Sequence, residues 1–69
     1  MNEADIQAIE YLTQSKVLEI TFENEANIDI NDVIGFADGM VLNGIKVYRG
    51  GKLLHDMVPT DAGWIERPT

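Results

Sequence analysis

Histidine, the side chain that most often does acid–base chemistry near neutral pH, and cysteine are scarce in this chain of 69 residues. His55 is its one histidine, Asp56 follows it directly, and there is no cysteine. Neighbouring residues on a strand point to opposite faces of a sheet, so His55 and Asp56 are not expected to form an oriented general-base pair. Ser15 falls in an expected turn, without an identifiable partner base. The sequence therefore predicts a protein that is not an enzyme and that needs no cofactor.

One stretch has the spacing of a calcium loop. Asn27, Asp29, Asn31 and Asp38 fall on positions 1, 3, 5 and 12 of an EF-hand. Position 6 of that loop needs a glycine for its sharp turn, and position 12 is normally a bidentate glutamate. Here position 6 is Asp32. We therefore expect no metal site, and a small-ligand or metal-binding domain is the weakest of the functional alternatives.

Acidic residues dominate the first part of the chain. The net charge is −7, and residues 1–43 hold nine acids against a single Lys. Residues 44–69 are nearly balanced in charge. Such a chain is repelled by the phosphate backbone, so we expect no direct binding to nucleic acid. An acidic surface suits a larger partner protein with a basic surface, although net charge also serves solubility alone.

The expected binding surface combines acidic side chains with two aromatic anchors. Tyr and Trp are enriched among interface hot spots. For Trp64 the alternative is a structural role, closing one end of a small barrel. The candidate partner-binding residues are Glu19, Glu23, Glu25, Asp29, Asp32, Tyr48 and Trp64.

Short strands must carry these residues. From Lys16 to Asn31 apolar and polar residues alternate on both sides of a turn, which predicts a β-hairpin. Its two arms share one apolar face if Phe22 lies opposite Ile28, with an odd number of residues in the connecting loop. Before this hairpin, residues 2–12 fit a helix or a strand, and we favour a strand from Ile6 to Leu12.

The second half of the chain is divided by its glycines. Residues 32–38 are the best candidate for a short helix, with Asp32 as its N-cap. Asn43-Gly44 and Gly50-Gly51 each predict a hairpin turn. Trp64-Ile65 is expected to form one more short strand. The expected core residues are Leu18, Ile20, Phe22, Ile28, Ile30, Leu42, Ile45 and Val47.

These elements predict a single small domain over residues 1–69. Its fold class is mostly β, with α+β at the margin, and it has five to six short antiparallel strands and one short helix near 32–38. We expect the strands to close into a small barrel or roll, because an open sheet of this size would leave two edges and an apolar face uncovered.

The expected function is a non-enzymatic acidic protein-binding module, of the kind that phages or mobile elements use as inhibitors, which occludes a basic surface on a larger protein. The alternative is a structural or assembly subunit that forms a homodimer through sheet edges, because a small domain gains buried area by pairing. No apolar run approaches the length of a membrane span, and the first residues are acidic where a signal peptide is basic. We therefore expect a cytoplasmic protein.

Overall fold

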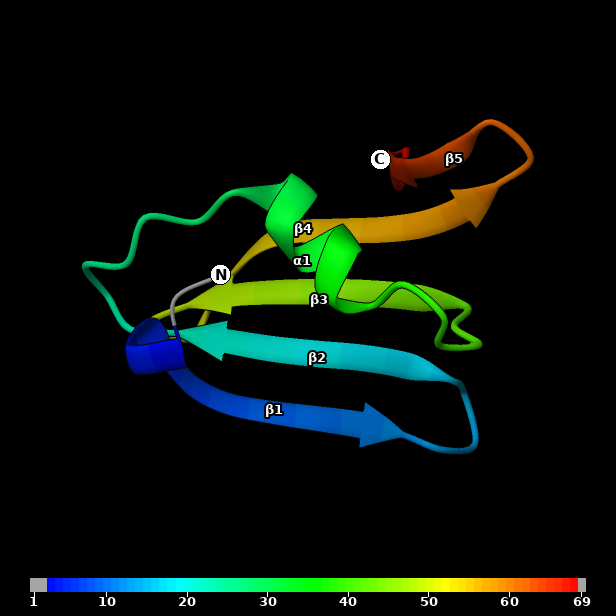
Figure 1. Ribbon diagram of the computed structural model, residues 1–69. Helices are drawn as coiled ribbons and strands as arrows, with labels where there is room; N and C mark the ends of the chain where they lie inside the picture. Colours follow the sequence, from blue (N-terminus) through cyan, green and yellow to red (C-terminus); the bar gives the residue numbers. More distant parts are fainter. Residues whose placement is uncertain (1–2, 69) are drawn as a thin grey trace.

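A computed structural model of the chain describes residues 3–68 and is built on one five-stranded sheet (Figure 1). A short 3₁₀-helix, η1 (Glu3–Asp5), precedes the first strand, and the helix α1 (Ile30–Phe36) lies between the second and third strands in the chain. The mostly β class with one short helix is confirmed. The strands, which lie side by side in chain order, are β1 (Ile6–Leu12), β2 (Val17–Phe22), β3 (Gly44–Arg49), β4 (Lys52–Thr60) and β5 (Gly63–Glu66).

The sheet is mixed and open. β2 and β3 run parallel, while the other three neighbouring pairs are antiparallel. A parallel pair needs a crossover connection, and the segment that contains α1 supplies it on one face of the sheet (Figure 1). β1 and β5 stay at the two edges and do not pair with each other. The predicted closure into a barrel is therefore wrong, because α1 covers the apolar face instead.

The hairpin predicted from Lys16 to Asn31 is wrong beyond its first arm. That arm is β2, but the chain leaves the sheet after Phe22 and enters α1 at Ile30. Ile30, Val33 and Ala37 recur at the spacing of one helix face, and this face packs against the sheet. Of the two isoleucines that suggest a second strand arm, only Ile30 belongs to this helical stripe, because Ile28 precedes the helix.

Of the two glycine turns, only the second is a hairpin. Gly50 and Gly51 have φ values of +57° and +82° and connect β3 to β4, with Tyr48 opposite Leu53. At Asn43-Gly44 the predicted hairpin is wrong. The N–H of Asn43 instead donates to the carbonyl oxygen of Lys16 at 2.7 Å, which aligns the start of β3 with the start of β2.

The core lies between α1 and one face of the sheet. Burying a large aliphatic or aromatic side chain contributes about 1.5–3 kcal/mol, so the buried side chains between α1 and the sheet supply much of the stability. Ile28 and Ile30, expected in the core, are only partly buried against it. The strands Ile6–Leu12 and Trp64-Ile65 that the sequence predicts are present as β1 and β5. The buried residues are Leu18, Ile20, Phe22, Ala26, Val33, Ala37, Leu42, Ile45, Val47 and Met57.

Candidate functional site

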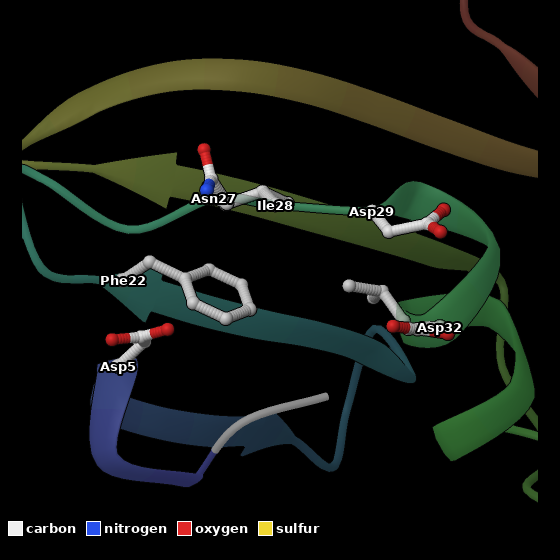
Figure 2. A pocket seen from close by; sticks show the side chains of 7 residues that line it. Asp5, Phe22, Asn27, Ile28, Asp29 and Asp32 are labelled. Carbon is white, nitrogen blue, oxygen red and sulfur yellow. The ribbon is translucent and has the colours of Figure 1, made fainter.

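A cavity of about 390 Å³ opens where β1 begins, β2 ends and α1 starts (Figure 2). Its apolar part is formed around the ring of Phe22, which is almost completely buried. Three carboxylates surround this apolar surface, and among residues 3–68 no Lys, Arg or His lines it. The lining residues are Asp5, Phe22, Asn27, Ile28, Asp29, Asp32 and Val33.

Asp5 reaches the cavity because β1 and β2 are neighbours. It is the last residue of η1, and its carbonyl oxygen accepts a hydrogen bond from the N–H of Glu23 at 2.8 Å. This bond ties the start of β1 to the end of β2. Figure 2 shows the Asp5 carboxylate beside Phe22, with Asp29 and Asp32 at the other side of the ring.

Asp29 and Asp32 are positioned by the first turn of α1. An Asp29 side-chain oxygen, Oδ1, accepts a hydrogen bond from the N–H of Asn31 at 2.9 Å, so Asp29 is the N-cap. The prediction that Asp32 caps the helix and that the helix spans 32–38 is therefore wrong by a few residues. Residues three apart lie on one flank of a helix, so both carboxylates belong to the flank that faces the cavity.

The loop between β2 and α1 adds further acids at this end of the sheet. Glu23 and Glu25 are exposed there, while Ala26 is buried and anchors the loop in the core. The Arg49 side chain donates from Nη1 to the carbonyl oxygen of Ala26 at 3.4 Å, which connects the loop to the end of β3. Four of the seven predicted partner-binding residues, Glu23, Glu25, Asp29 and Asp32, therefore lie together.

The other three predicted residues lie apart from the cavity. Glu19 and Tyr48 are half-buried on the sheet face opposite α1, where the Tyr48 hydroxyl donates to Oε2 of Glu19 at 3.4 Å. Burial raises the pKa of Tyr48, and the negative charges of Glu19 and Asp56 raise it further. Trp64, on β5, is partly buried against the core, in a sheet that has no barrel end to close.

The sequence does not reveal two residues that matter here. Asp5 lines the cavity through a contact between strands, and no local pattern indicates that contact. Glu66 is the partner of His55: His55 Nδ1 lies 2.5 Å from Glu66 Oε1. His55 and Asp56 are in register with Val47 and Lys46, on opposite faces of the sheet as expected. Neither His55 nor Glu66 lines the acidic cavity.

Within residues 3–68, no group of three or more His, Cys, Asp or Glu side chains is arranged to hold a metal ion. In the same part of the chain, no helix has the length and apolar character needed to cross a membrane. Comparisons of the chain with protein-family models, curated proteins and solved structures find no match. The cavity's own geometry, three carboxylates beside an apolar surface, suits a cationic side chain.

Proposed function

We propose that this protein is a non-enzymatic acidic module that acts in the cytoplasm by occluding a basic surface on a larger partner protein. Such occlusion would make it an inhibitor of that partner. The observation that carries the proposal is the convergence of Asp5, Asp29 and Asp32 on one cavity beside the ring of Phe22 (Figure 2).

The cavity matches the two parts of a Lys or Arg side chain. The methylene stem of such a side chain packs on apolar surface while its charged end stays near water. Phe22 and Val33 are almost completely buried, so the accessible apolar surface comes mainly from the half-buried Ile28, and the carboxylates accept hydrogen bonds from the cation. Hydrogen bonds to charged groups contribute about 1.5–3 kcal/mol each. A single inserted cation can therefore anchor the partner.

The surrounding acids act at longer range. Glu23 and Glu25 are exposed beside the cavity, so their charges add to its field. Complementary charge mainly raises the association rate, and salt weakens it as the screening length falls from about 10 Å at 0.1 M to about 3 Å at 1 M. Association with the partner should therefore slow steeply as salt is added.

The first test uses small cationic probes. Acetyl-arginine methylamide and acetyl-lysine methylamide are titrated into the ¹⁵N-labelled protein, and amide shifts are followed by NMR. We expect the largest shifts at Asp5, Phe22 and Val33, and their loss in the double variant Asp5→Asn/Asp32→Asn. The matched control, Asp38→Asn/Asp61→Asn, makes the same change in net charge outside the cavity and should keep them. Shifts that persist in the cavity variant would contradict the proposal.

The second test uses the partner itself, captured from the source cell with the full chain. Reversing Glu23 and Asp29 to Lys should slow association by about tenfold or more at low salt. His55→Ala should leave the association rate nearly unchanged. A rate that does not depend on salt, or a larger effect of His55→Ala, would move the binding surface to Tyr48 and Trp64.

Self-association through sheet edges, the alternative expected from the sequence, stays a prediction. The two edges are β1 and β5. β5 has four residues, and Pro68 follows two residues after its end, so it offers little backbone for pairing. A homodimer of this kind would therefore pair through β1.

A further inference from the structure

β1 is an edge strand with few of the features that protect such edges. Among the described strands only β2 pairs with it. Its seven residues, IQAIEYL, include no Lys, Arg or Pro, the residues that commonly block edge pairing. Ile9 and Tyr11 are 46% and 40% exposed. The outer edge of β1 therefore combines free backbone groups with exposed apolar side chains.

The usable part of this edge is a regular stretch of five residues. The register between β1 and β2 shifts between Ile6 and Ala8, so the strand is regular from Ala8 to Leu12. Ile9 is in register with Ile20 and lies on the face that α1 covers, while Glu10 is in register with Glu19 on the other face. A strand added to β1 would therefore meet Ile9 and Tyr11 on one face, and on the other face the charge of Glu10, which lies between Ala8 and Leu12.

The apolar side of this edge continues beyond the strand. The Tyr11 hydroxyl lies 3.5 Å from the carbonyl oxygen of Val41, in the connection from α1 to β3. Val41 is 72% exposed, and Met40 beside it is 41% exposed. Apolar side chains of an added strand would thus contact Ile9 and Tyr11 and reach the exposed residues of this connection.

A second copy of the chain fits this edge poorly. In an antiparallel pair the residues opposite each other share a face, so a symmetric pairing that uses all of Ala8–Leu12 places Glu10 opposite Glu10 of the second copy. Like charges directly opposite each other destabilise a strand pair. Both copies also carry a net charge of −7. Charge complementarity instead favours a basic strand.

We propose that β1 accepts an extended basic segment of the partner protein as a sixth strand. Apolar side chains of the segment lie on the side of Ile9 and Tyr11, and its Lys or Arg side chains lie opposite Glu10. Strand addition of this kind draws affinity from main-chain hydrogen bonds and specificity from alternate side chains. The proposal rests on the proposed function and adds to it the extended conformation of the bound segment. Because Asp5 lines the acidic cavity and directly precedes β1, the segment runs along the edge toward that cavity.

The test uses two synthetic peptides with equal numbers of Lys and Val. In one peptide the two residues alternate, and in the other they form separate blocks, so that net charge and composition are identical. Only the alternating peptide can place Val on one face and Lys on the other. An N-methylated version of the alternating peptide keeps the side chains and removes the backbone donors.

Affinity and NMR hydrogen exchange of the β1 amides are the readouts. The alternating peptide should bind more tightly than the block peptide and, at saturation, slow exchange of alternate amides within Ala8–Leu12 by about tenfold or more. N-methylation should abolish that protection. Glu10→Lys should weaken binding about three- to tenfold, and Glu10→Gln should have a smaller effect. The control Asp61→Lys, in the turn between β4 and β5, should leave the affinity unchanged.

Each contrary result has its own meaning. Equal binding of the two peptides without protection of β1 would overturn strand addition and leave the acidic cavity as the whole site. Binding of neither peptide would overturn the proposed function together with this inference. Protected β1 amides in the peptide-free protein, accompanied by a concentration-dependent dimer, would show that a second copy occupies the edge and would also overturn the inference.

Discussion

Glu66 connects the edge strand β5 to β4 through His55, whose Nδ1 lies 2.5 Å from Glu66 Oε1. Because a carboxylate has no proton to donate, the proton of this hydrogen bond is carried by His55 Nδ1. Glu66 Oε2 also accepts from the N–H of Asp56 at 3.3 Å. A single exposed carboxylate thus makes two of the contacts that hold β5 in place.

Glu66→Ala should loosen β5 without much effect on the rest of the fold. Glu66 is 56% exposed, and exposed pairs of this kind contribute up to about 1 kcal/mol. We expect faster amide hydrogen exchange in Gly63–Glu66, with exchange in β2 and β3 unchanged. His55→Ala, which leaves the contact to Asp56 intact, should have a smaller effect on β5. Equal acceleration in all strands would show that the pair contributes to global stability instead.

Ile20→Ala should be among the most destabilising single changes. Ile20 is fully buried at the centre of β2, and truncation of a buried Ile to Ala costs about 2–5 kcal/mol through lost transfer energy and a residual cavity. Urea denaturation measures the change in the free energy of unfolding. The control Val41→Ala, at a side chain that is 72% exposed, should stay within about 0.5 kcal/mol. A change of that small size at Ile20 would contradict the described core.

Asp29→Ala should remove the N-cap of α1. The Asp29 side chain accepts the N–H of Asn31 at 2.9 Å, and loss of an N-cap typically costs about 1 kcal/mol. Asp29→Asn keeps an oxygen that can cap the helix but removes the charge. We therefore expect it to retain most of the unfolding free energy while weakening the binding of cationic probes. If the two variants are equally unstable, capping is not the main structural role of this residue.

Stability should fall at alkaline pH because of Tyr48. Its pKa is raised above the ordinary value of 10.0, first by burial and then by Glu19 and Asp56. The folded state therefore holds the Tyr48 proton more tightly than the unfolded chain does. The stabilisation that results is complete below pH 10.0 and is lost as the pH rises through the folded pKa.

Tyrosinate absorbance measures this pKa directly when Tyr11→Phe leaves Tyr48 as the only tyrosine. In that background, adding Glu19→Gln should lower the midpoint of the titration, because it removes one of the charges that raise the pKa. Tyr48→Phe should flatten the alkaline loss of unfolding free energy. A Tyr48 midpoint at or below 10.0 would contradict the described contact with Glu19.

Local patterns along the chain determined most of the strands of this protein. Alternation marks β2, and the glycine pair after Arg49 marks the turn between β3 and β4, because both signals depend on nearest neighbours. Most of the core follows for the same reason: Leu18, Ile20 and Phe22 recur every second residue and are buried. Asp29 and Asp32, which are close together in the chain, also line the same cavity.

Tertiary structure decided the topology and the completed cavity. A few alternating residues around Ile28 and Ile30 fit a strand or the start of a helix, and only packing of the helical stripe on the sheet distinguishes them. Once α1 crosses the sheet, β3 must lie parallel to β2, and the apolar face is covered without closure of a barrel. Asp5 and Asp32 then lie on two sides of Phe22, although they are far apart in the chain (Figure 2). No local pattern predicts this arrangement, because it depends on a contact between strands.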